Sequence, residues 1–228
     1  MPLVAAFSNM GYFGPTNGQI SNQYPTLIVA AGYAFSIWGV IFLLALVFGI
    51  ADWRRSTGIN DRTRLMVIAG YLLTTSWMVV FSQLWFWGAL AVMIGAFVCL
   101  LYAALQAHDH GSGIARWALG MHAGWLTLAL FLNIAQVIVA FELLPIDNML
   151  SWTLVLFVLS ASVAAWALIR MRGLVAYAIP VIWGLVAVYI KQSAAGLPGG
   201  NVAAPVALIL AAGFLLLTIG LQWRARSR

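Results

Sequence analysis

The basic residues of this 228-residue chain occupy alternate gaps between its apolar segments, and this pattern limits what the chain can fold into. Ten of the eleven follow the first, third, fifth and seventh segments, namely Arg54, Arg55, Arg62, Arg64, Arg116, Arg170, Arg172, Arg224, Arg226 and Arg228, whereas Lys191 follows the sixth. Cytoplasmic loops of membrane proteins collect arginine and lysine. We therefore expect odd-numbered segments to end inside the cell, with the N-terminus outside and the C-terminus cytoplasmic.

The composition favours a chain that is solvated by lipid. Hydrophobic residues make up 64% of the sequence and charged residues 7%, whereas about a quarter of the residues in soluble proteins are charged. The net charge of +6 could suggest nucleic acid, but the arginines stand in short loops, where orientation and anionic lipid headgroups account for them. We expect membrane lipids as partners, no nucleic acid, and a multi-pass protein of the inner (cytoplasmic) membrane.

Seven segments are long enough to cross a bilayer, which takes about 20 helical residues. They span roughly residues 27–50, 66–83, 87–106, 117–140, 150–169, 173–190 and 203–222, and their interiors contain no Asp, Glu, Lys or Arg. The expected fold class is therefore all-α, a polytopic transmembrane bundle of about seven spans. The short link at residues 82–85 predicts a tight hairpin of the second and third spans. Residues 1–26, rich in Asn, Gly, Pro and Ser, are expected to form turns outside the membrane.

The uncharged spans disfavour several function classes. Proton pumps, ion channels and ion-coupled transporters place ionisable groups on their paths. A retinal protein needs a lysine within its last helix, and the only lysine, Lys191, lies at the end of the sixth span. The sequence also shows no nucleophile–base pair, phosphate-binding loop or paired carboxylates. We therefore expect a protein that is not an enzyme; an enzyme that modifies its bound ligand is a third, less favoured hypothesis.

Polar and aromatic residues recur on one face of the fourth span. Trp125, Ala129, Asn133 and Gln136 follow one another at helical spacing. Small and polar residues commonly hold membrane helices together, and the alternative is a groove with aromatic walls and a few amides for a flat apolar ligand. Because buried indoles need acceptors, we expect the tryptophans within spans to face other helices or a ligand: Trp38, Trp77, Trp125, Trp166 and Trp183. Those at span ends should form an interfacial belt: Trp53, Trp85, Trp87, Trp117, Trp152 and Trp223.

The histidines are weak metal candidates. His108 and His110 have no third ligand nearby in the sequence, so we predict no metal site there. His122 lies little more than one turn inside the fourth span and could serve as an axial ligand to a haem or chlorophyll. A hydrogen-bonded histidine near the interface is the commoner arrangement.

Two segments resemble a known family. Residues 31–42 read AGYAFSIWGVIF, which resembles the Pro-Pro-x-Trp…Pro-Ile-Trp-Gly-Thr-Leu-Tyr segment of the second helix in the translocator protein family, also called tryptophan-rich sensory proteins (TspO/MBR). Residues 125–133 read WLTLALFLN, which is similar to the Trp-Val-x-Phe-Ala-x-x-Leu-Asn of that family's fifth helix. The resemblance covers roughly residues 30–140. Later spans, including AYAIPVIW at residues 176–183, resemble the longer bacterial members with additional C-terminal helices.

This resemblance implies an organisation for the chain. An extracytoplasmic segment (1–26) precedes a TspO-like core (27–140), whose spans correspond to family helices two to five. A three-helix extension (141–228) follows. The family's first helix has no equivalent here, and its absence would leave a lateral face open to a partner helix.

The resemblance also implies a ligand, because family members bind porphyrins and sterol-like molecules within the bundle. Trp125 and Ala129 match cavity-lining positions, Asn133 matches the Asn of the Leu-Asn pair, and Trp38 matches the Trp of Ile-Trp-Gly. The chain departs from the family where Asn-x-x-Trp becomes Thr74-Thr75-Ser76-Trp77, which lacks the amide. Ala30 and Ala31 likewise replace two prolines.

The leading hypothesis is a non-enzymatic protein that binds a porphyrin or chlorophyll-type tetrapyrrole, or another planar apolar ligand, as a sensor, carrier or regulator. The expected ligand-binding residues are Trp38, Trp77, Trp125, Ala129, Asn133 and Gln136. The alternative is an accessory transmembrane subunit of a larger membrane complex, for example a photosynthetic pigment–protein complex. A homo-oligomer is a further possibility.

Overall fold

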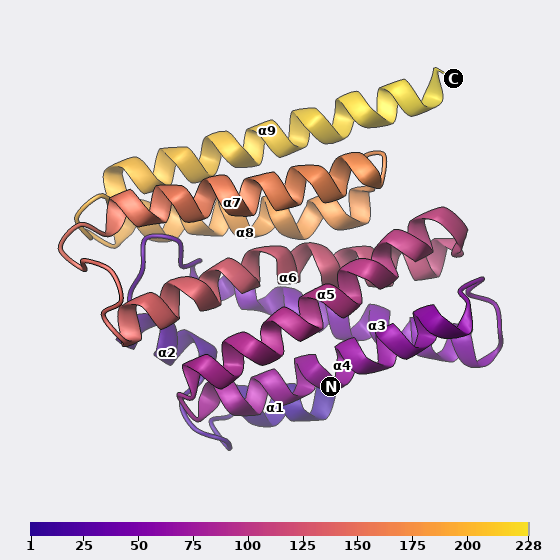
Figure 1. Ribbon diagram of the computed structural model, residues 1–228, viewed down its shortest axis with the longest axis horizontal. Coiled ribbons are helices and arrows are strands. Elements are labelled where there is room, and N and C mark those ends of the chain that lie inside the picture. The colour runs from indigo at the N-terminus through magenta and orange to yellow at the C-terminus, as the bar shows by residue number, and fades with distance from the viewer. Residues whose placement is uncertain (228) are drawn as a thin grey trace.

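Seven long apolar helices form the molecule in the computed structural model, which describes residues 1–227 (Figure 1). They are the first span, made of η1 (Gly32–Ser36) and α3 (Ile37–Trp53), then α4 (Asp61–Ser82), α5 (Phe86–His110), α6 (Gly113–Ala140), α7 (Met149–Arg170), α8 (Val175–Ala194) and α9 (Gly200–Arg226). Each helix is long and apolar enough to cross a membrane. This confirms the predicted all-α polytopic bundle of seven spans, and Arg228 lies outside the described residues.

Successive spans run in opposite directions, so the arginine-bearing loops gather at one end of the bundle, on the right in Figure 1. Two ion pairs join neighbouring helices there. Arg64 Nε of α4 lies 2.8 Å from Asp52 Oδ2 of α3, and Arg170 Nη2 of α7 lies 3.0 Å from Asp109 Oδ2 of α5. Lys191 is at the opposite end, where its Nζ donates to Asn22 Oδ1 at 3.1 Å. The side of the membrane that each end faces stays a prediction.

The predicted hairpin of the second and third spans is confirmed. Only Gln83, Leu84 and Trp85 separate α4 from α5, and Leu84 makes the reversal with a φ of 59°. The helix α4 also begins earlier than expected, at Asp61, because the Asn60 side chain accepts a hydrogen bond from the Thr63 N–H and caps the first turn. Arg62 and Arg64 therefore belong to a helical turn.

The first 26 residues are more regular than the sequence suggested. Turns occur at residues 10–14, but α1 (Pro2–Asn9) and α2 (Asn17–Gln23) flank them. Thr16 and Gln19 form a reciprocal capping box that starts α2. The helix α1 packs against α4, where Ser8 Oγ lies 3.2 Å from Ser82 Oγ. The signal for α2 was present in the sequence as Thr-x-x-Gln, but the many turn-forming residues obscured it.

Residues 24–31 form a non-helical strap, although the sequence predicted that the first span begins at residue 27. The strap lies along α8, where the Ala31 N–H donates to the Ala187 carbonyl. The buried Gln192 Nε2 donates to the carbonyl oxygens of Thr26 and Val29, each at 3.1 Å. Irregular backbone is tolerated at membrane depth when protein groups satisfy it. The apolar run Leu27–Ala30 is buried without being helical, so hydropathy alone placed the helix start too early.

The helix α6 is the centre of the bundle. Within an apolar 18-residue window of this helix, 83% of the residues are buried. Gly120 and Gly124 face α8, and a Cβ added at Gly124 would collide with the Tyr177 carbonyl oxygen. Small residues four apart allow membrane helices to approach closely in this way. Thr127 donates to the Ala123 carbonyl, so its oxygen accepts from the Tyr177 hydroxyl, at 2.7 Å.

The tryptophans follow the sequence predictions with two clear exceptions. Trp38, Trp77 and Trp125 are buried among helices as expected, and Trp183, partly exposed, donates to the Ala34 carbonyl. Trp166, however, is 55% exposed on the outer surface of α7, so the prediction that it faces a helix or ligand is wrong. Five of the six span-end tryptophans are exposed as a belt requires: Trp53, Trp85, Trp87, Trp117 and Trp223. The sixth, Trp152, is buried because its indole donates to the Pro145 carbonyl.

Candidate functional site

Three buried indole rings from three helices meet in the interior of the bundle. Trp38 of α3 stacks on Trp77 of α4, with ring centroids 6.3 Å apart and an interplanar angle of 29°. Trp125 of α6 meets Trp38 edge to face, with centroids 6.1 Å apart and an angle of 82°. Both arrangements are preferred for aromatic pairs. The three rings thus form a continuous aromatic surface inside the protein.

A small cavity lies against these rings, and its volume is about 20 Å³. All six residues that the sequence suggested for a ligand site line it: Trp38, Trp77, Trp125, Ala129, Asn133 and Gln136. The structure adds five lining residues, which are Asn17, Ser21, Phe35, Phe81 and Leu132. Phe81 stands one turn after Trp77 and could have been found by helical spacing. Asn17 and Ser21 belong to α2, which the sequence did not predict as a helix.

Asn133 is a partner of Trp77. The Trp77 Nε1–H donates to Asn133 Oδ1 at 3.0 Å, and Asn133 Nδ2 donates to the Ala129 carbonyl at 2.9 Å. A side-chain amide can accept two hydrogen bonds and donate two, so one acceptor site and one N–H of Asn133 are left for another group. Its first role in the fold is to join α4 to α6, and orientation of a ligand is at most a second role.

Two polar atoms at the cavity are buried without a hydrogen-bond partner in the described part of the chain, namely Trp125 Nε1 and Asn17 Oδ1. One is a donor and the other an acceptor. Buried polar groups are usually paired, and each unpaired group costs about 1–3 kcal/mol. The Gln136 side chain is also buried beside the cavity. The site therefore offers donor and acceptor capacity within aromatic walls.

His122 does not line this cavity. It is fully buried behind Trp38, and its ring stacks on Tyr71 with centroids 5.6 Å apart. Its Nε2 lies 3.5 Å from Thr74 Oγ1, whose own proton goes to the Gly70 carbonyl, so the imidazole Nε2 is the donor in that weak contact. Among the described residues no group of three His, Cys, Asp or Glu side chains is placed to hold a metal. His122 therefore lies outside the cavity that the six expected ligand-binding residues line.

The side chains that line the cavity carry no ionisable group, and the ion pairs lie at the arginine-rich end of the bundle. Such a site can bind by ring stacking, dispersion and a few neutral hydrogen bonds. Its volume corresponds to about one water molecule. Any ligand with a ring system must therefore move some of the lining side chains apart.

Comparison with known proteins places the whole architecture in one family. A family model described as TSPO-like protein matches residues 1–221, which include the two short N-terminal helices and nearly all of α9. No curated protein and no solved structure matches the chain. The family match thus extends well beyond the residues 30–140 over which the sequence motifs were recognised.

Proposed function

Because this chain belongs to the family of TSPO-like proteins and is a multi-pass membrane protein, we propose that it binds a tetrapyrrole or another planar apolar ligand. The ligand would lie between Trp38, Trp77 and Trp125, and the protein would act without catalysis as a sensor, carrier or regulator. The observation that supports this proposal most is the meeting of three indole rings from separate helices at one uncharged cavity.

The arrangement suits a flat ligand for two reasons. Stacked and edge-to-face indoles offer large rigid surfaces, and their polarised faces favour aromatic partners over flexible chains. The unpaired Trp125 N–H and Asn17 Oδ1 would pair with an acceptor and a donor on the ligand. A tetrapyrrole carries both kinds of group. The inner membrane, with the arginine-rich end towards the cytoplasm, is the location that we propose for this protein.

Titration of the purified protein in lipid nanodiscs with protoporphyrin tests the proposal. We expect quenched tryptophan emission and a shifted porphyrin absorption band. The double variant Trp125→Phe with Asn133→Ala should bind about tenfold more weakly, since the first change shrinks one aromatic wall and removes the Trp125 N–H, and the second releases the Trp77 ring from its hydrogen bond. Trp166→Phe is the matched control, because Trp166 lies on the exposed surface of α7. Equal affinity in all three proteins would contradict the proposal.

The accessory-subunit hypothesis makes a different prediction for the same material. Extraction in mild detergent followed by native mass measurement should then give a large hetero-complex. A lone 24.7 kDa protein or a small homo-oligomer would contradict that hypothesis. Porphyrin binding by the isolated chain would mean that the chain carries a complete ligand site of its own, as the first proposal requires.

A further inference from the structure

A second cavity lies beside the first, on the other side of Trp125. Its volume is about 10 Å³, and its walls come from α6, α7, α8 and the strap formed by residues 24–31. Trp125 and Leu132 line both cavities, so these two side chains are the partition between them. The second cavity is lined almost wholly by apolar groups, and apart from the shared Trp125 indole its one polar side-chain group is the Ser160 hydroxyl.

Trp125 lacks the hydrogen bond that holds Trp77 and Trp183 in place. The Trp77 indole donates to Asn133 and the Trp183 indole donates to the Ala34 carbonyl. The Trp125 Nε1–H is buried without a partner among the described residues. The Trp125 ring meets the rings of Trp38 and Phe35 edge to face, and its centroid lies 6.3 Å from that of Phe35. No hydrogen bond therefore has to break when this ring turns.

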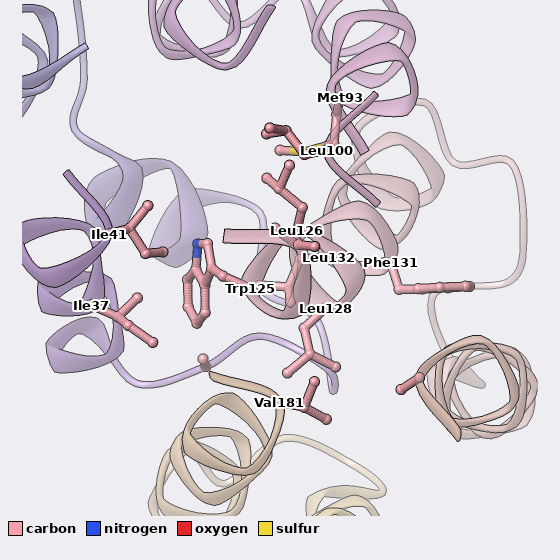
Figure 2. Packing of buried hydrophobic residues seen from close by; sticks show 14 of the residues in the cluster. Ile37, Ile41, Met93, Leu100, Trp125, Leu126, Leu128, Phe131, Leu132 and Val181 are labelled. Atoms are coloured by element: carbon pink, nitrogen blue, oxygen red, sulfur yellow. The ribbon is translucent and has the colours of Figure 1, made fainter. Parts of the chain in front are cut away.

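Gly184 of α8 lies close to the ring, and because it has no side chain the second cavity reaches the backbone of α8 there. A Cβ added there would lie 2.5 Å from Leu128 Cδ1 and 3.5 Å from Trp125 Cζ3. Figure 2 shows Trp125 projecting from α6 towards Ile37 and Ile41 of α3, with Leu128 of α6 and Val181 of α8 below it. The indole thus stands between two helices, next to a void on each side.

We propose that Trp125 is a movable partition and that the ligand site extends into the second cavity, where it accepts an apolar substituent of the planar ligand. This inference rests on the proposed function. Each cavity alone has room for about one water molecule, so a ring system enters only when a wall moves. Of the two side chains that divide the voids, the Trp125 ring is the larger, and no side-chain hydrogen bond opposes its movement. Movement of Trp125 joins the first cavity to the second, whose walls include residues of α7 and α8.

Filling the second cavity tests this extension without touching the first. Ser160 is buried on α7 and lines only the second cavity, so Ser160→Val adds volume there. We expect protoporphyrin to bind about tenfold more weakly, since overpacking of a closed interior is costly. Ser162→Val is the matched control. It makes the same change on the exposed face of the same helix and removes a similar local hydrogen bond, that of Ser162 Oγ to the Val158 carbonyl.

A second variant protects the test against misfolding. Ala30→Val fills the same cavity from the strap and should weaken binding to a similar extent. Circular dichroism and gel filtration would show which variants retain the wild-type fold.

A measurement without ligand separates this inference from the proposed function. In protein labelled with 5-fluorotryptophan, Trp125→Phe identifies the ¹⁹F resonance of Trp125. We expect that resonance to be split or broadened by exchange in the wild type and in Ser162→Val, and to be a single sharp line in Ser160→Val. If protoporphyrin does not bind at all, the proposed function is wrong. The ¹⁹F spectrum still shows whether the Trp125 ring moves, because it is measured without ligand. A single sharp line in the wild type, or equal porphyrin affinity in Ser160→Val and Ser162→Val, would overturn the inference.

Discussion

The helices α6 and α9 are both long and apolar, but they occupy opposite environments. In an apolar 18-residue window of α6, 83% of the residues are buried within the protein, whereas in that of α9 only 33% are buried and the helix lies at the edge of the bundle (Figure 1). The mean hydropathy is nevertheless lower in the buried helix, at 1.9 for α6 against 2.5 for α9. Lipid solvates apolar side chains as well as a protein interior does, so apolar residues gain little by burial, whereas polar groups need partners inside. In this bundle the less apolar helix is the central one.

The difference also shows what each helix contributes. The small, polar and aromatic residues of α6 bring it close to α8, pair with Tyr177 and Trp77, and line both cavities. The helix α9 packs mainly against α8 and α7 and presents large aliphatic side chains outward. Matched substitutions in the two regions should therefore have unequal effects on the free energy of unfolding.

The largest difference in the free energy of unfolding is expected for glycine substitutions. Gly124→Val on α6 places a branched side chain against the Tyr177 carbonyl and Pro180, which forces α6 and α8 apart. We expect a loss of about 3 kcal/mol or a failure to fold. Gly213→Val on α9 meets no neighbouring atom and should change stability by less than about 0.5 kcal/mol. Unfolding in mixed detergent micelles, followed by circular dichroism, measures both, and similar losses would show that the α6–α8 contact is not special.

Glutamine substitutions should give the next largest difference in the free energy of unfolding. Gln192→Leu removes the donor that the carbonyls of Thr26 and Val29 share, so that the Val29 carbonyl loses its side-chain donor and the Thr26 carbonyl keeps only the Val29 N–H. We expect a loss of about 2 kcal/mol. Gln222→Leu on α9 removes one hydrogen bond, to the Gly173 carbonyl at a partly exposed site, and should cost about 0.5 kcal/mol. The same unfolding assay compares them; an equal or smaller loss at Gln192 would mean that the strap is not held by this amide.

Threonine substitutions should give the smallest difference in the free energy of unfolding. Thr127→Val keeps the shape of the side chain but leaves the buried Tyr177 hydroxyl without its acceptor. Interhelical hydrogen bonds in membranes contribute about 0.6 kcal/mol on average, so a loss of about 1 kcal/mol is expected. Thr218→Val on α9 removes only a bond to the Phe214 carbonyl of its own helix, and should be nearly neutral. Thermal unfolding of both variants with Tyr177→Phe as a background checks the cause, because the effect of Thr127→Val should disappear there.

Much of the architecture could be predicted because charge and length are strong signals in a membrane chain. The number of spans and the α4–α5 hairpin follow from apolar runs and the short link at residues 82–85. The face of each helix was harder to predict. Trp166 and Trp125 look alike in sequence, yet one is exposed and the other buried. Because lipid and protein are both apolar surroundings, periodicity of hydrophobic residues does not separate them.

The candidate site was predicted where one helix carries several of its residues. Trp125, Ala129, Asn133 and Gln136 share a face of α6, and helical spacing alone groups them. What spacing cannot give is the contribution of distant segments, such as Asn17 from α2. Nor could it separate His122 from the cavity, since that depends on the rotation of α6 against α3 and α4. The second cavity depends on α7 and the strap, and no local pattern indicates it.

The most direct test of the account is an experimental structure of the protein saturated with protoporphyrin in lipid. The account predicts density for the porphyrin between Trp38, Trp77 and Trp125, with the Trp125 ring displaced towards Gly184 and Ser160. Porphyrin bound only on the lipid-facing surface, with the three indoles still packed around an unchanged cavity, would contradict it.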